Sequence, residues 1–192
     1  STAMKVVVVF LIDGSDRFLN MTINAINSFI EQGIPENITI GLLVPKDFPV
    51  AQRVIPLLYN PKVELDVREF VLFSHFTNWN PTQYKLDLIK FAGDYDIVTW
   101  LDSDVILYNH ELGSFLQRFW DSGRYYAFPR DHVNANPEFI QLWPGNKSRF
   151  FVPQACFMAF RATKMNEIFS SWEAIWERWI YPQPFVNIAD PL

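Results

Sequence analysis

Residues 5–12 form the stretch that most constrains the fold, because every residue after Lys5 in it is apolar and most are β-branched. A strand with one face in water alternates polar and apolar residues, whereas an unbroken apolar run is typical of a strand buried on both faces. The run is too short to span a membrane and it opens the domain, so we interpret it as a strand and not as a signal peptide. A doubly buried strand predicts a sheet with helices on both sides.

Helical and strand-like patterns alternate after this run. Apolar residues recur at helical spacing from Phe18 to Ile30, and Gly33 ends that helix. We predict further strands at residues 38–44, 63–70, 96–101, 125–129 and 157–160, and further helices at residues 52–59, 81–93, 112–120 and 165–179. The alternation through the first half predicts an α/β fold with a mostly parallel central sheet flanked by helices.

Size, charge and cysteine content narrow the classes of function. The chain has 192 residues, 49% of them hydrophobic, which suits one globular domain that we place at residues 4–192, after a cloning remnant at residues 1–3. A net charge of −5 argues against a nucleic-acid partner, which needs a basic face. The single cysteine, Cys156, excludes an intramolecular disulfide and a cysteine-rich metal site. No transmembrane segment is apparent, and we expect a cytoplasmic protein.

Two aspartates, Asp102 and Asp104, directly follow the predicted strand at residues 96–101. If the chain stays extended there, the two carboxylates point the same way, roughly 6 to 7 Å apart at about 3.3 Å per residue. They repel each other unless a cation lies between them, and Mg²⁺ or Mn²⁺ takes one or two carboxylates together with phosphate oxygens and water. The alternative is that the pair only caps a turn toward a helix near His110. Apolar residues on both sides of the pair favour the metal site, because unpaired carboxylates are costly there.

Asp13 and Lys85 are further candidates for ligand contacts. Asp13 follows the first strand, and a mostly parallel sheet binds its ligands at the carboxyl ends of its strands, where Asp102 and Asp104 also lie. It could instead cap the next helix, a role that Ser15 or Asp16 can fill. Lys85 lies on the helix before the aspartate pair, where it could contact a phosphate or a ribose, or simply be solvated.

The segment from Tyr84 to Asp104 resembles the GT-A glycosyltransferases, in particular glycosyltransferase family 8, the type of glycogenin and bacterial galactosyltransferases. The shared features are a basic residue, a helix, a strand and a D-x-D motif. The resemblance implies a GT-A (nucleotide-diphospho-sugar transferase) Rossmann-like fold. It also implies that Asp102 and Asp104 hold the metal, and that Lys85, Asp102 and Ser103 contact the donor, Lys85 at the position of a family arginine. Asp13 matches an acidic first loop near the nucleotide.

Three further site residues rest on the resemblance alone. Asp131 matches an aspartate that contacts the sugar, and Gln154 lies where the family usually has asparagine. Asp190 matches the start of the family's catalytic aspartate/glutamine region, so the three are expected to be catalytic. The histidine that serves the family as third metal ligand has no counterpart before Leu192, and we expect a domain truncated at its C-terminus or an incomplete site.

The sequence therefore predicts a metal-dependent glycosyltransferase that moves a sugar from a nucleotide-diphosphate donor, with a UDP-sugar favoured, to a glycan or other hydroxyl acceptor. Mn²⁺ or Mg²⁺ would be the cofactor, and no oligomeric state is indicated. A non-catalytic or incomplete nucleotide-sugar-binding domain is the alternative. A haloacid-dehalogenase-like phosphatase, which also uses D-x-D, ranks below it because its motif follows the opening strand, whereas here the motif follows the fourth predicted strand.

Overall fold

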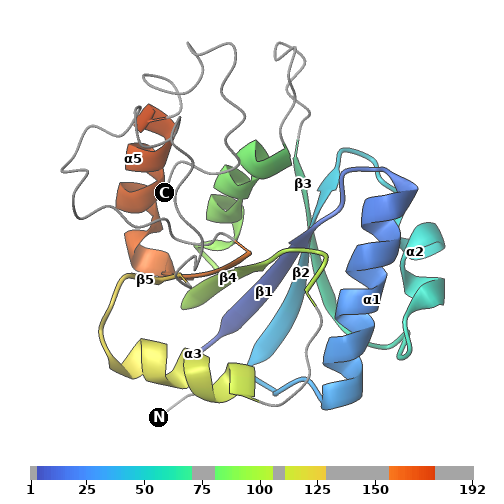
Figure 1. Cartoon of the computed structure of the whole chain (residues 1–192), viewed down its shortest axis with the longest axis horizontal. Coiled ribbons are helices and arrows are strands. Elements are labelled where there is room, and N and C mark those ends of the chain that lie inside the picture. The colour runs from blue at the N-terminus through green and yellow to red at the C-terminus, as the bar shows by residue number, and fades with distance from the viewer. Residues whose placement is uncertain (1–3, 71–80, 106–110, 129–155, 176–192) are drawn as a thin grey trace, which may run out of the picture.

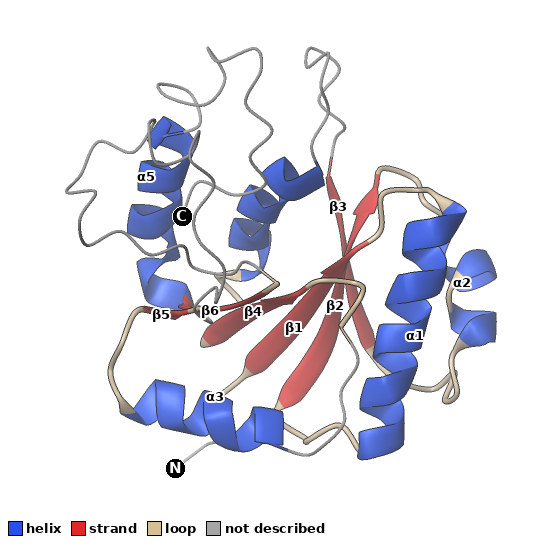
Figure 2. Ribbon diagram, viewed as in Figure 1, coloured by secondary structure: helices blue, strands red, loops and turns tan. Residues whose placement is uncertain are grey.

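The computed structural model describes residues 4–70, 81–105, 111–128 and 156–175, without the side chains of 81–84 and 172–175. Its centre is a six-stranded sheet in the order β3-β2-β1-β4-β6-β5 (Figures 1 and 2). The strands are β1 (Val6–Leu11), β2 (Ile38–Pro45), β3 (Leu65–Phe70), β4 (Ile97–Leu101), β5 (Tyr126–Ala127) and β6 (Phe157–Arg161). The first four run parallel, and β6 pairs antiparallel with both β4 and β5. The prediction of a mostly parallel sheet is confirmed.

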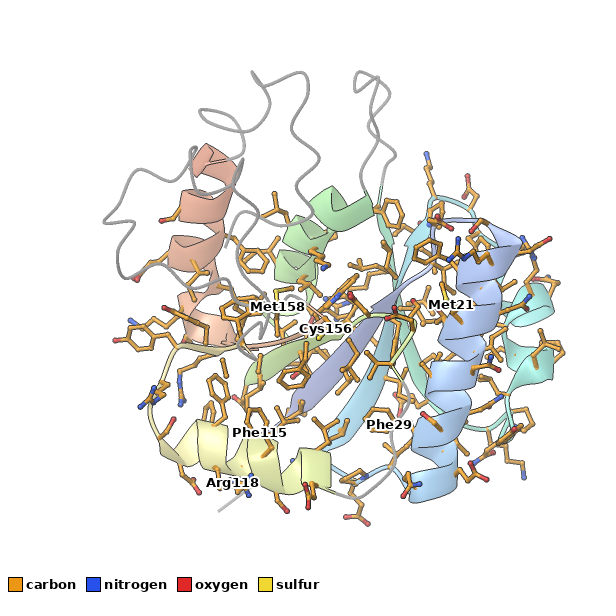
Figure 3. All side chains as sticks on the ribbon, viewed as in Figure 1. Met21, Phe29, Phe115, Arg118, Cys156 and Met158 are labelled. Carbon is orange, nitrogen blue, oxygen red and sulfur yellow. The ribbon has the colours of Figure 1, made fainter. Side chains whose placement is uncertain are left out.

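Helices cover both faces of the sheet, as the doubly buried first strand predicts. Helices α1 (Asp16–Gln32) and α3 (Glu111–Asp121) pack on one face, and η2 (Pro81–Phe91) and α5 (Met165–Ile175) on the other. Phe29 and Phe115 lie on the first side and Met158 on the second (Figure 3). The short elements α2 (Val50–Arg53), η1 (Ile55–Leu57) and η4 (Ala162–Lys164) complete the described part of the chain.

Strand β1 lies at the centre of the sheet, and every one of its residues is buried. Its side chains alternate between the two cores, with Val6, Val8 and Phe10 under α1 and Val7 and Val9 under η2. Burial of apolar surface contributes about 25 cal/mol per Å², so a strand that packs on both faces is a main source of stability. Burial on both faces of the sheet therefore explains why this stretch of the sequence is apolar without interruption.

Element η2 confirms the helix predicted at residues 81–93, and it is of the 3₁₀ type. A 3₁₀ helix has three residues per turn, so side chains three apart eclipse one another. Lys85, Leu88 and Phe91 are spaced in this way, and all three are buried, Lys85 with only 4% of its surface exposed. The solvated position considered for Lys85 is therefore wrong, because the helix type aligns it with the apolar face.

A polar cluster ties strand β3 to the end of η2. The Arg68 guanidinium donates to the carboxylates of Asp66 (2.8 Å) and Asp94 (2.9 Å) and to the carbonyl of Lys90, and it lies 4.5 Å from the Phe91 ring centroid. Tyr95 donates its hydroxyl to Asp66 at 2.7 Å. Burial and this hydrogen bond raise the pKa of Tyr95 to about 12. Burial alone would raise the pKa of Asp66, but the bonds from Arg68 and Tyr95 lower it. The cluster fixes the helix that carries Lys85.

No helix in the described part of the chain has the length and apolar character needed to cross a membrane.

A buried threonine on β4 yields a stability prediction. The Thr99 hydroxyl has no hydrogen-bond partner among the described residues, and its strand neighbours are Val8 and Ala159. An unpaired buried hydroxyl costs about 1–3 kcal/mol, so Thr99→Val is expected to raise the melting temperature by roughly 2–4 °C or more.

The control is Thr22→Val, because the Thr22 hydroxyl bonds to Leu11 O (3.3 Å) and to Ser103 Oγ (2.7 Å) and its loss is expected to lower the melting temperature. Differential scanning calorimetry of the two variants measures the contrast, and shifts of equal sign would contradict it.

Candidate functional site

The candidate site lies where the strand order reverses. Strand β1 pairs with β2 on one side and with β4 on the other, and the helices that lead to these two neighbours, α1 and η2, lie on opposite faces of the sheet. Parallel α/β sheets bind ligands in the crevice that this reversal opens at the carboxyl ends of the strands. Asp13 follows β1 and the aspartate pair follows β4, so the predicted meeting of these residues at one edge is confirmed.

The aspartate pair lies on a turn and not on an extended continuation of β4. The carbonyl of Asp102 accepts a hydrogen bond from the amide of Val105 (3.1 Å), which places Ser103 and Asp104 at the centre of the turn. The prediction of two carboxylates on an extended segment is therefore wrong. The turn leaves Asp104 exposed, whereas the Asp102 side chain is 35% exposed and Ser103 is buried. The Asp102 amide donates to Cys156 O (2.9 Å), and the turn begins at the next residue.

Asp102 has two partners on the η2 side of the sheet. The indole N–H of Trp100 donates to Asp102 Oδ1 at 2.7 Å, and Lys85 Nζ lies 3.6 Å from the same oxygen. Lys85 Nζ also lies 5.2 Å from the Trp100 ring centroid, within the range of a cation–π interaction. The three side chains form one contiguous group, which we call the Asp102 support. Lys85 thus brings a positive charge to the edge where the predicted donor would bind.

Ser103 faces the interior. Its hydroxyl lies 3.2 Å from the carbonyl of Leu11 and 2.7 Å from the Thr22 hydroxyl, and Thr22 lies 3.3 Å from the same carbonyl. This buried network joins the ends of β4 and β1 to α1. The donor contact expected of Ser103 stays a prediction, since the hydroxyl is engaged in joining these elements.

Asp13 lies beside the start of α1 without capping it. The N-cap is Ser15, whose hydroxyl accepts from the amide of Phe18 (3.3 Å). Asp13 Oδ1 accepts from the amide of Ser15 at 2.8 Å, which closes a tight loop after β1. The half-buried carboxylate of Asp13 is thereby held at the same sheet edge as Asp102.

Cys156, labelled near the centre of Figure 3, accepts a hydrogen bond at its carbonyl from the amide of Asp102 (2.9 Å). Burial raises the pKa of its thiol, and the negative charges of Asp102 and Asp104 raise it further. The thiol is therefore neutral at pH 7, and it adds no third negative charge to those of the two carboxylates.

The residues present fit a hard divalent cation. Asp102 and the exposed Asp104 offer carboxylate oxygens, which Mg²⁺ and Mn²⁺ prefer, and these ions commonly use one or two protein carboxylates plus phosphate oxygens and water. No group of three or more histidine, cysteine, aspartate or glutamate side chains suited to a metal occurs within residues 4–70, 81–105, 111–128 and 156–175. Two carboxylates are the number of protein ligands that Mg²⁺ commonly uses.

Asp131, Gln154 and Asp190, the three residues expected to be catalytic, lie outside the described residues. Two residues that the sequence did not single out, Trp100 and Thr22, contact the site. Trp100 had a usable signal, because residues two apart in a strand face the same way and Trp100 precedes Asp102 by two. Thr22 had none, since it reaches Ser103 from a helix far away in the chain.

Comparison with solved structures identifies the fold. The chain is 18% identical to the galactosyltransferase LgtC, crystallised with donor and acceptor sugar analogues, with a TM-score of 0.67, over 90% of this chain and 64% of that one. It matches the bifunctional glycosyltransferase WbbM at 20% identity and a TM-score of 0.64, over 93% and 36% of the two chains. The mannosyltransferase PcManGT from Pyrobaculum calidifontis, solved with GDP-Man and Mn²⁺, matches at 11% identity and a TM-score of 0.52, over 88% and 47%.

These three matches are to longer proteins, and the chain spans from about a third to just under two thirds of their length. No protein-family model matches the chain, and no curated protein sequence is significantly similar to it. The likeness is therefore one of structure. The six-stranded sheet with its helical layers, together with the solved neighbours of the chain, shows that the chain has the GT-A fold of nucleotide-sugar transferases.

Proposed function

We propose that this chain is the donor-binding domain of a metal-dependent glycosyltransferase, which moves a sugar from a nucleoside-diphosphate sugar to an acceptor hydroxyl. The observation that carries the proposal is the pair Asp102 and Asp104 on a turn at the carboxyl end of β4, beside the end of β1. The solved neighbours support it, since they are glycosyltransferases, one solved with donor and acceptor sugar analogues and one with GDP-Man and Mn²⁺. A UDP-sugar is the favoured donor.

The roles of the residues follow from their positions. Asp104, exposed on the turn, and Asp102, held by Trp100, would bind Mn²⁺ or Mg²⁺. When bound, such an ion neutralises charge on the departing nucleoside diphosphate. Lys85 would add a second positive charge from the protein side, and Asp13 would contact the base or ribose from the end of β1. Water exclusion from the site would favour the acceptor hydroxyl over hydrolysis.

The catalytic residues belong to the proposal as well. Asp131 and Gln154 would contact the transferred sugar, and Asp190 would begin the region that completes the catalytic centre. Each is assigned by its resemblance to glycosyltransferase family 8. A family 8 enzyme with a D-x-D metal site is thus the specific form of the proposal.

Thermal shift assays with UDP-, GDP- and CMP-sugars, each with and without Mn²⁺, test the proposed function. A ligand at 100 times its Kd stabilises a protein by about 2.7 kcal/mol, which corresponds to a rise of roughly 5–10 °C for a domain of this size. We expect such a rise for at least one donor, UDP-sugars first, and only in the presence of Mn²⁺.

The other outcomes separate the alternatives. Absence of any shift, together with hydrolysis of p-nitrophenyl phosphate, would contradict the proposal and favour a phosphatase. A Mn²⁺-dependent shift with neither sugar transfer nor donor hydrolysis would favour a non-catalytic binding domain. For a transferase we expect the sugar to be released into water or transferred onto a hydroxyl acceptor. Chromatography of the products measures this.

A further inference from the structure

Trp100 is a buried residue whose indole N–H donates a hydrogen bond to a carboxylate of the candidate site. The residue is 3% exposed, and its ring packs in the core between the sheet and η2. An indole has a single N–H donor and no acceptor, so a buried tryptophan needs one partner. That partner is Asp102 Oδ1, at 2.7 Å, a distance typical of a charge-assisted hydrogen bond.

Lys85 completes the arrangement around the indole. The face of an aromatic ring is negative and its edge is positive. The Lys85 ammonium lies 5.2 Å from the ring centroid of Trp100, and the Asp102 carboxylate lies at the N–H edge of the same ring. The positive group and the negative group thus occupy the sides of the indole that each prefers, and Lys85 Nζ is also 3.6 Å from Asp102 Oδ1. Hydrogen bonds and charges that polarise one another in this way strengthen each other in a buried setting.

The backbone of Asp102 is fixed as well. Its amide donates to Cys156 O (2.9 Å) and its carbonyl accepts from the amide of Val105 (3.1 Å). With the main chain held on both sides and Oδ1 held by Trp100, the plane of the carboxylate is determined, and so is the direction of its second oxygen, Oδ2. A ligand held in advance in its binding geometry loses less freedom when the cation arrives.

We propose that Trp100 is a positioning residue, which orients the Asp102 carboxylate for the cation and the nucleoside diphosphate through its indole N–H. The inference rests on the proposed function, since it assigns Trp100 to donor binding at the same site. Groups that hold a metal ligand in place typically account for 10- to 100-fold in metal affinity or activity. Trp100→Phe keeps an aromatic ring in the core but removes the N–H, so it isolates this contribution.

The first experiment needs no ligand. In a ¹⁵N-labelled protein, the indole N–H signal that disappears in Trp100→Phe is expected to shift in Asp102→Asn, because the acceptor loses its charge. The matched control is Asp121→Asn, an exposed aspartate on α3, which should leave that signal in place. Asp102 is about a third exposed and asparagine keeps the Oδ1 acceptor, so we expect this variant to fold even where Trp100→Phe lowers stability. An unchanged indole signal in Asp102→Asn overturns the inference whatever the protein binds.

The second experiment measures binding of UDP with and without Mn²⁺ by isothermal titration calorimetry. Trp100→Phe is expected to weaken the Mn²⁺-dependent binding about 10- to 100-fold, whereas Trp120→Phe, on α3, is expected to bind as the unchanged protein does. Equal affinities of Trp100→Phe and the unchanged protein would overturn the role of Trp100 and leave the proposed function standing. Failure of the unchanged protein to bind any of UDP, GDP or CMP with Mn²⁺ would overturn both.

Discussion

An Asp104→Asn variant is expected to lose Mn²⁺-dependent UDP binding by roughly 100-fold or more, because even residues that only support metal ligands account for 10- to 100-fold. Asp104 is exposed at the centre of the turn after β4. An exposed surface substitution changes stability by no more than about 0.5 kcal/mol, so the melting temperature without ligands is expected to stay within about 2 °C. A large loss of binding without a loss of stability is the signature of a ligand contact.

Isothermal titration calorimetry with UDP, in Mn²⁺ and then in EDTA, measures the effect. The control is Asp121→Asn, which removes an exposed carboxylate from α3, where Gln117 donates to Asp121 at 3.0 Å and can donate equally to an asparagine. We expect this variant to bind UDP normally. If Asp104→Asn binds UDP as tightly in Mn²⁺ as the unchanged protein does, Asp104 is not a metal ligand and the assignment of the pair fails.

The strands could be predicted from the sequence because their causes are local. An unbroken apolar run has few alternatives to a strand buried on both faces, and β1 and β4 lie within one residue of their predicted bounds at each end. The meeting of Asp13 with Asp102 and Asp104 at one edge also follows, since parallel strands share a carboxyl edge. The antiparallel direction of β6 has no local signal in its apolar residues, because both directions bury the same side chains.

The chemistry around Asp102 could not be predicted because it depends on partners that are distant in the chain. The sequence leaves a solvated Lys85 as one of two interpretations, and only the 3₁₀ helix η2, which aligns Lys85 with Leu88 and Phe91, shows that it is buried. The bonds that join Ser103 to Thr22 and to Leu11 O have no sequence signal, and its donor contact stays a prediction. A sequence pattern gives the position of a polar residue along the chain, whereas its partners are decided by how the helices pack.

Gly41, in the middle of β2, gives the second large effect, this time on stability. A Cβ atom added there would lie 2.8 Å from Val7 Cγ2, 3.1 Å from Val9 Cγ2 and 3.1 Å from Phe91 Cε1, all closer than ordinary van der Waals contact. Val7 and Val9 are β-branched and belong to the buried central strand, so they have little freedom to move. The Phe91 ring of η2 occupies the space that a side chain at position 41 would need.

Gly41→Ala is therefore expected to destabilise the fold by about 1–3 kcal/mol, the usual effect of overpacking, and to lower the melting temperature by roughly 2–10 °C. The matched control is Gly93→Ala, where no atom lies within 4 Å of an added Cβ and stability should not fall. Differential scanning calorimetry measures both variants.

Because Phe91 and Lys85 share η2, a displacement of that helix also carries Lys85 away from Asp102. Gly41→Ala should therefore weaken Mn²⁺-dependent UDP binding, whereas Gly93→Ala should not. If Gly41→Ala is as stable as the unchanged protein, η2 can shift without a loss of stability. The Asp102 support would then be less rigid than the packing around Gly41 implies.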